Sequence, residues 1–125
     1  MRRQDRGSAT LEISILAPIL LLVIFTIVQV GLWSYARSLA LGAAQEGVAA
    51  GRAYGAAPHA GRDRAQAFLA DVGGDSLVGG TVASAVDATT VRVEVRGRAL
   101  SVLPGIPGLP VHQPAQGPRE RFPAP

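Results

Sequence analysis

Glu12 is the side chain whose chemistry fits its surroundings least, because a long apolar stretch follows it directly. The chain runs from Ile13 to Ala36 without a charged residue. An ionised side chain within a membrane-spanning helix costs about 2.5 to 3.5 kcal/mol at the helix centre and less near an interface. Glu12 therefore either finds a positively charged partner or lies hydrated in the first helical turn, where the helix dipole stabilises a carboxylate.

The other titratable side chains form no catalytic or metal-binding pattern. His59 and His112 are the only histidines, they lie far apart in proline-flanked segments, and the chain has no cysteine. A zinc site needs three or four nearby ligands, and acid–base catalysis needs a positioned partner group. The glycine pairs at 73–74 and 79–80 are interpreted as turn glycines and not as a phosphate-binding loop. We expect no enzyme activity, no metal or other cofactor and no small-molecule substrate.

Three arginines would form a basic strip if the segment around residues 90–96 is a strand. Arg92, Arg96 and Arg98 would then share one face of that strand with Glu94. This strip is interpreted as a solvated face, with a contact for an acidic partner or an anionic cell-wall polymer as the alternative. The net charge is only +3 and the arginines are scattered, which argues against a nucleic-acid partner.

The longest predicted element is an apolar helix that crosses the lipid bilayer. A helix over residues 13–36 spans roughly 36 Å at about 1.5 Å per residue, enough for a hydrocarbon core about 30 Å thick. Arg2, Arg3 and Arg6 precede it, and basic residues beside a span stay in the cytoplasm. We therefore predict a cytoplasmic N-terminus, with the chain from Arg37 onward outside the cytoplasm.

Three residues within the predicted span carry further information. Pro18 removes a backbone donor and predicts a kink, which is either a tolerated irregularity or a bend that shapes packing against a partner helix. Trp33 and Tyr35 lie near the outer end of the span, where amphipathic rings favour the headgroup region. The outer boundary of the membrane is therefore expected close to these two rings.

Small residues recur at every fourth position beyond the span, at Ala43, Gly47, Gly51 and Gly55. If the helix continues out of the membrane, they line one side of it. A stripe of small residues lets the backbone of another helix approach closely. The alternative is that the period follows by chance from the Ala- and Gly-rich composition.

The rest of the chain predicts a small α+β domain. Residues 62–72 have apolar side chains at helical spacing. Residues 90–96 alternate apolar and charged side chains, as a half-buried strand does, and pair with residues 81–86 as a hairpin. Prolines confine the tail to an edge strand or an extended segment. The predicted organisation is an α+β fold whose sheet covers the long helix, with a leader (1–7), a transmembrane helix (8–36), an extracytoplasmic domain (37–103) and a Pro-rich tail or edge strand (104–125).

The segment 7–12, Gly-Ser-Ala-Thr-Leu-Glu, directly ahead of the apolar run, resembles the processing site of type IV pilin-like proteins. In that group a prepilin peptidase cuts after a glycine, here Gly7, and a glutamate is the fifth residue of the mature chain. Counting from Ser8, Glu12 is the fifth. Together with Pro18 and the stretch 44–50, Ala-Gln-Glu-Gly-Val-Ala-Ala, this segment is similar to TadE-like pseudopilins of the tight-adherence (Flp pilus) machinery.

The resemblance covers roughly residues 7–55 and fits the hairpin and the ending 119–122 more loosely. It implies a minor pilin or assembly factor in a bacterial cytoplasmic membrane, with the prepilin peptidase, other pilins and tight-adherence subunits as partners. After cleavage, Glu12 would meet the new ammonium group of Ser8 on a neighbouring subunit. Many relatives carry larger soluble domains, some with cysteines, whereas this domain is small and has none.

Two other interpretations stay open. A secreted protein would be released by signal peptidase at one of two small-x-small sites, which end at Ala36 and Ala40. A plain membrane-anchored surface protein would keep Met1.

Overall fold

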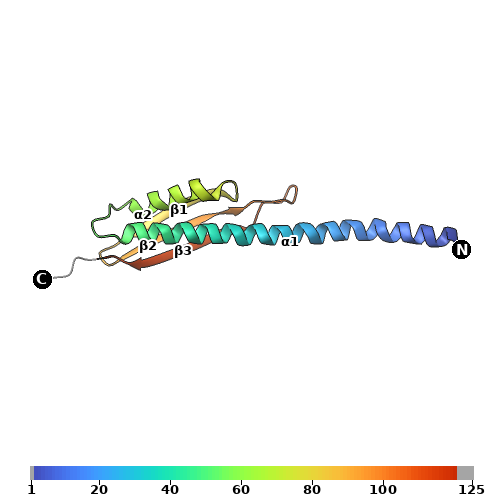
Figure 1. Ribbon diagram of the computed structural model, residues 1–125, viewed down its shortest axis with the longest axis horizontal. Helices are drawn as coiled ribbons and strands as arrows, with labels where there is room; N and C mark the ends of the chain where they lie inside the picture. The colour runs from blue at the N-terminus through green and yellow to red at the C-terminus, as the bar shows by residue number, and fades with distance from the viewer. Residues whose placement is uncertain (1, 121–125) are drawn as a thin grey trace.

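One helix, α1 (Arg2–Arg52), runs along most of the molecule, and all other elements gather around its C-terminal half (Figure 1). The structure, a computed structural model, describes residues 2–120. Met1 of the predicted leader and residues 121–125 of the predicted tail lie outside the described residues. The elements after α1 are α2 (Ala60–Phe68), a π-helical turn η1 (Leu69–Gly73), β1 (Leu77–Val86), β2 (Thr90–Ala99) and β3 (Pro110–Pro118).

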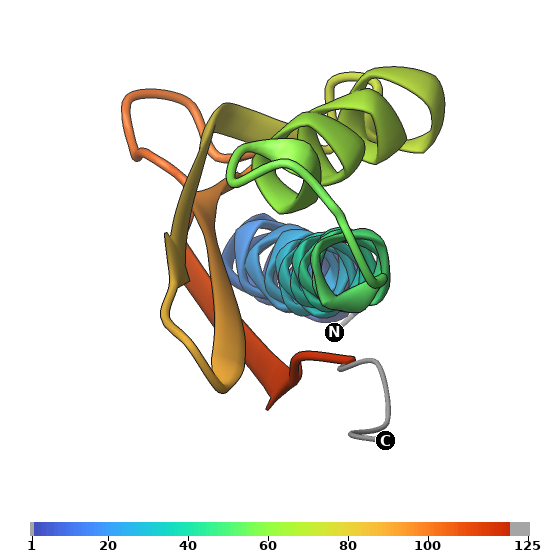
Figure 2. The ribbon, with the colours of Figure 1, turned by 90° about the vertical axis from the view of Figure 1, so that its left-hand side faces the viewer.

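The helix α1 continues through Pro18 without interruption. Neither ribbon view shows a sharp bend along it (Figures 1 and 2), so the predicted kink is not a pronounced feature. A proline removes one backbone hydrogen bond of the helix and leaves the bonds on either side in place. The residues around Pro18 are exposed, so no packed neighbour forces the helix to bend there.

The three strands form one antiparallel sheet in the order β1-β2-β3. The predicted hairpin is present: Val86 pairs with Val91, and the amide of Asp87 donates to the carbonyl of Thr90 at 3.0 Å. β3 pairs along the other side of β2, from Thr90↔Pro118 to Arg98↔Pro110. As an edge strand it tolerates prolines, which cannot donate to a further strand.

The glycine pair at 79–80 is not in a turn, which corrects the expectation from the sequence. It lies within β1, where the register shifts between Val78 and Thr81. Gly79 has a φ of +63°, a conformation that glycine adopts without the penalty of a Cβ atom. An extra residue in one strand produces such a bulge and increases the local twist.

The core lies between the inner face of the sheet and the C-terminal half of α1. Alternation along β2 turns Val91, Val93 and Val95 inward, and all three are fully buried. They meet a row of buried alanines on α1, namely Ala36, Ala40, Ala43 and Ala44. Seen along α1, the sheet covers one side of the helix and α2 covers another (Figure 2). The predicted α+β fold, with the sheet covering the long helix, is confirmed.

Candidate functional site

The N-terminal half of α1 carries a large uncovered apolar surface. Between Leu11 and Val28 its large apolar side chains are all exposed. Among residues 2–120, the stretch Gly7–Arg52 is the one helix long and apolar enough to cross a membrane, and only 6% of its most apolar window is buried. Exposed apolar patches of this size mark contact with a membrane or with other proteins.

The two residues of the predicted processing site and the predicted assembly residue lie together at the N-terminal end of this surface. Gly7, Ser8 and Glu12 are helical residues of α1, and all three are exposed. Ser8 and Glu12 are four residues apart and therefore lie on the same side of the helix. A Cβ atom added to Gly7 would meet nothing within 4 Å. The structure thus leaves this end of α1 accessible, and the exposed N-terminal half of the helix separates it from α2 and the sheet.

The small-residue stripe lies at the other end of α1, where the chain itself covers it. Ala43 is fully buried. A Cβ atom on Gly47 would lie 2.7 Å from the carbonyl oxygen of Gly61 on α2 and 3.1 Å from a methyl group of Val93. One on Gly51 would lie 2.8 Å from Val91. The expectation of a separate partner helix at these residues is therefore replaced by an intramolecular contact with α2 and β2.

Gly55 does not extend this stripe. It follows the end of α1 and has a φ of +75°, so it belongs to the turn that leads into α2. The four-residue period indicates a close approach of backbones, but the spacing carries no information on whether the approaching backbone belongs to the same chain.

A polar contact that the sequence did not reveal joins α1 to the segment between β2 and β3. Gln29 is buried, and its side-chain nitrogen donates to the carbonyl of Leu100 at 3.0 Å while its oxygen accepts from the amide of Val102 at 3.0 Å. The indole of Trp33 donates to the carbonyl of Pro110 at 3.3 Å. Gln29 is the only amide side chain between residues 13 and 36, a signal that could have singled it out.

Trp33 also contacts a cation. The guanidinium of Arg37 lies 4.9 Å from the centre of the indole ring, within the range of a cation–π interaction. Arg37, the first arginine after the apolar stretch, thus packs against the indole ring of Trp33. Trp33 also connects this end of the predicted span to β3, through its hydrogen bond to Pro110.

The predicted basic strip on β2 is a charge network on the outer face of the sheet. Glu94 accepts from Arg92 at 2.6 Å and from Arg96 at 3.4 Å, and Nε2 of His112 lies 3.5 Å away. The hydrogen bond from Arg92, its positive charge, and the contacts with Arg96 and His112 hold the pKa of Glu94 below its usual value. His112 reaches this group because Arg96 pairs with it across the strands.

This network does not resemble a metal centre. Among residues 2–120, no three side chains of the His, Asp or Glu type lie together as metal ligands would. One carboxylate surrounded by cations has its charge neutralised by them, and exposed ion pairs of this kind contribute little to stability. We assign the network to the solvated face of the sheet.

A family model described as TadE-like protein matches residues 7–49. The N-terminal part of this chain is similar to TadE-like proteins. No curated protein and no solved structure gave a match. The TadE-like segment contains the predicted processing site and the exposed apolar surface, and it ends within α1, before α2 and the sheet.

The match and the candidate membrane helix together support a membrane-anchored, pilus-associated protein. The TadE-like family is a structural family of pilus systems and is not known for enzymatic activity.

Proposed function

We propose that this TadE-like protein is a minor pilin or pseudopilin that assists assembly or anchoring of a tight-adherence (Flp-type) pilus or a related secretion machinery. It crosses the bacterial cytoplasmic membrane once, with residues 1–7 in the cytoplasm and the α+β domain outside. The observation that carries this proposal is the coincidence of the TadE-like match with the uncovered apolar surface of α1. A helix in the core of a soluble protein buries its apolar side chains, whereas these are exposed.

Prepilin peptidase is the proposed processing enzyme, and it cuts between Gly7 and Ser8. The bond lies within helical backbone, so the helix must open locally before the bond enters an active site. Glycine favours this opening, because it is less stable in a helix than alanine by about 1 kcal/mol. Cleavage removes the basic leader and leaves one ammonium group, on Ser8, at the membrane face.

Assembly then depends on Glu12 and on helix packing. The carboxylate of Glu12 pairs with the ammonium group of Ser8 on a neighbouring subunit, which neutralises both charges in the apolar surroundings of packed helices. The packing surface is the exposed part of α1 between Leu11 and Val28, with Pro18 in it. Ala43, Gly47 and Gly51 are occupied within the chain and contribute by holding the domain on α1.

The secreted alternative is less compatible with the fold. Ala36 and Ala40, the ends of the two small-x-small sites, are fully buried under the sheet in the middle of α1. Cleavage after Ala36 would also remove Gln29 and Trp33, which bind the backbone of the segment between β2 and β3. The folded domain thus uses residues that signal peptidase would discard.

The N-terminal residue of the protein purified from membranes tests the proposal. We expect Ser8 after co-expression with a prepilin peptidase and Met1 without it. A start just after Ala36 or Ala40 would establish the secreted alternative, and Met1 under both conditions would establish a plain anchor. Reporters fused to the C-terminus measure orientation: one active only outside the cytoplasm should work, and one active only inside should not.

A further inference from the structure

The segment that joins β2 to β3, residues 100–109, is an apolar loop. No charged residue occurs from Ala99 to Val111. Three of its large apolar side chains are exposed: Leu100 by 40%, Ile106 by 57% and Leu109 by 50%. The turn at the other end of β2, Asp-Ala-Thr at 87–89, is polar by contrast. Of the two segments that join β2 to its neighbouring strands, the apolar one is therefore residues 100–109, which we call the apolar loop.

The apolar loop has a defined shape. The amide of Ile106 donates to the carbonyl of Leu103 at 3.3 Å, and the amide of Ala99 donates to the carbonyl of Leu109 at 3.0 Å. Pro104 and Pro107 fix their own φ angles and lack a backbone donor. The loop thus presents Ile106 on a closed turn, with fewer free amide groups than an ordinary loop of its length.

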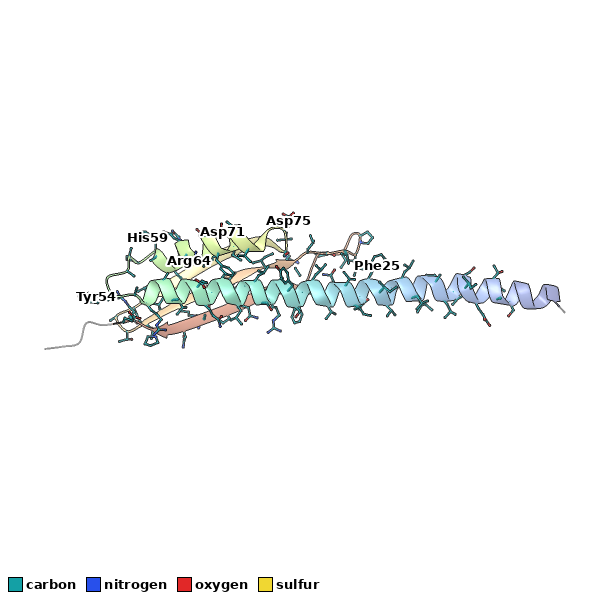
Figure 3. All side chains as sticks on the ribbon, in the orientation of Figure 1. Phe25, Tyr54, His59, Arg64, Asp71 and Asp75 are labelled. Carbon is teal, nitrogen blue, oxygen red and sulfur yellow. The ribbon has the colours of Figure 1, made fainter. Side chains whose placement is uncertain are left out.

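The apolar loop lies beside the apolar surface of α1. Gln29 holds the backbone of Leu100 and Val102 through two hydrogen bonds of 3.0 Å. The tip of the loop reaches the level of the labelled Phe25 on α1, well inside the predicted span (Figure 3). The domain therefore extends back along the helix toward the N-terminus, and its leading edge is the apolar loop.

If α1 spans the membrane, the outer edge of the hydrocarbon core falls near the level of Gln29. The exposed apolar stretch from Leu11 to Val28 is about 27 Å long at 1.5 Å per residue, close to a core thickness of about 30 Å. Trp33, which favours the membrane interface, follows at the next turn. If α1 spans the membrane, the loop tip lies below this edge and beside acyl chains.

The hydrogen bonds of the loop suit such surroundings. Backbone groups in hydrocarbon need partners within the protein, because no water is available there. Gln29 supplies both an acceptor for the amide of Val102 and a donor for the carbonyl of Leu100. A glutamine side chain without hydrogen-bond partners is energetically unfavourable among lipid acyl chains. Here the polar atoms of Gln29 form hydrogen bonds with the backbone of the loop.

From these observations we propose that the apolar loop inserts into the outer leaflet of the membrane, with lipid acyl chains around Ile106 and Leu109. The domain is then fixed to the bilayer at two places, by α1 and by the loop, and its tilt and rotation relative to the membrane are restricted. This inference rests on the proposed membrane anchoring by α1. It adds a lipid contact by a part of the chain that lies outside the TadE-like segment.

The chain has no cysteine, so a single introduced cysteine carries a spin label at one site only. We would label Ile106→Cys and, in separate proteins, Leu109→Cys, Val23→Cys and Ala57→Cys. Val23 is exposed in the middle of the span, and Ala57 is exposed between α1 and α2 at the far end of the domain. Each full-length protein is reconstituted at low density in phosphatidylcholine vesicles, and collisions with oxygen and with a water-soluble nickel chelate are measured.

We expect the labels at Ile106, Leu109 and Val23 to be accessible to oxygen and protected from the chelate, and the label at Ala57 to show the reverse. A lipid-accessible Val23 with water-accessible Ile106 and Leu109 would overturn the loop insertion and leave the anchor intact. A water-accessible Val23 would overturn the membrane anchor and this inference with it. Labels at 106 and 109 shielded from both reagents would indicate a second copy of the chain as the occupant, which also overturns it. Unfolding temperatures equal to that of the unlabelled protein exclude misfolding of the variants.

Discussion

Gly47 of α1 and Gly61 of α2 are in direct backbone contact. A Cβ atom added to Gly47 would lie 2.7 Å from the carbonyl oxygen of Gly61, and a Cβ atom added to Gly61 would lie 2.9 Å from the carbonyl oxygen of Gly47. The contact is reciprocal, and both glycines are buried. Only residues without a side chain allow two helices to meet at this distance. The pair therefore sets the separation of α1 and α2, and with it the space in which Val93 packs.

A methyl group at this contact should destabilise the domain. We expect Gly47→Ala to lower the free energy of unfolding by about 1 to 3 kcal/mol through overpacking, offset in part by the better helix propensity of alanine, up to about 1 kcal/mol. Trp33 is the only tryptophan, so its fluorescence reports unfolding of the domain in detergent.

Gly31→Ala is the matched control, because Gly31 lies on the same helix and a Cβ atom there would meet nothing within 4 Å. Its unfolding temperature should equal or exceed that of the unchanged protein. Equal unfolding temperatures for Gly47→Ala and Gly31→Ala would contradict the close contact of the two glycines.

Acid should weaken the turn between β1 and β2. Asp87 accepts hydrogen bonds from the amides of Thr89 and Thr90 and from the hydroxyl of Thr90, which lower its pKa from 3.8 to about 2. A carboxylate whose pKa is depressed by folding stabilises the folded state above its unfolded-state pKa and loses this contribution as the pH falls through the folded-state value. The contribution is therefore complete at neutral pH and declines between about pH 4 and pH 2.

The variant Asp87→Asn tests this origin of the acid sensitivity. It should unfold at a lower temperature than the unchanged protein at pH 7, and the difference should shrink as the pH approaches 2. Asp71→Asn, which changes an exposed carboxylate on η1 (Figure 3), serves as the control and should leave the pH profile unchanged. A constant difference between Asp87→Asn and the unchanged protein across this pH range would refute the explanation.

Loss of the carboxylate at residue 12 should affect assembly and not processing. We expect Glu12→Gln to be inserted and cleaved normally but to co-purify with other pilins far less, since breaking a buried ion pair costs about 3 to 5 kcal/mol. Ser14→Ala, two residues further along the exposed part of α1, is the control. Undiminished co-purification of Glu12→Gln would rule out the proposed pair with Ser8.

Substitution at the proposed cleavage site should have the opposite effect. Gly7→Val places a β-branched side chain beside the bond to be cut, so the protein should stay full-length in the membrane when the peptidase is present. Mass spectrometry of the purified protein measures the cleaved fraction. Ala9→Val, on the other side of the bond, should still be processed, and cleavage of Gly7→Val to the same extent would remove Gly7 from the proposed site.

The elements of this fold could be predicted because each depends on a local pattern. The uncharged run from Ile13 to Ala36 predicted the first part of α1, and alternation over residues 90–96 predicted β2 with its buried valines. The prolines of residues 104–125 predicted either an edge strand or an extended tail, and part of this segment forms the edge strand β3. The family resemblance, too, depended on a short contiguous segment, residues 7–12, followed by the apolar run. Period and composition are properties of residues that are neighbours in the sequence, so these elements could be predicted without knowledge of any distant contact.

The partners of these elements could not be predicted in the same way. The spacing of Ala43, Gly47 and Gly51 indicated a close approach of backbones but not that α2 and β2 of the same chain make it. Gln29 binds Leu100 and Val102 across 71 and 73 residues of sequence, and His112 reaches Glu94 only through the pairing of β3 with β2. A periodic pattern indicates which side of an element is buried. Which group covers that side depends on how the whole chain packs, because many segments of similar chemistry could do so.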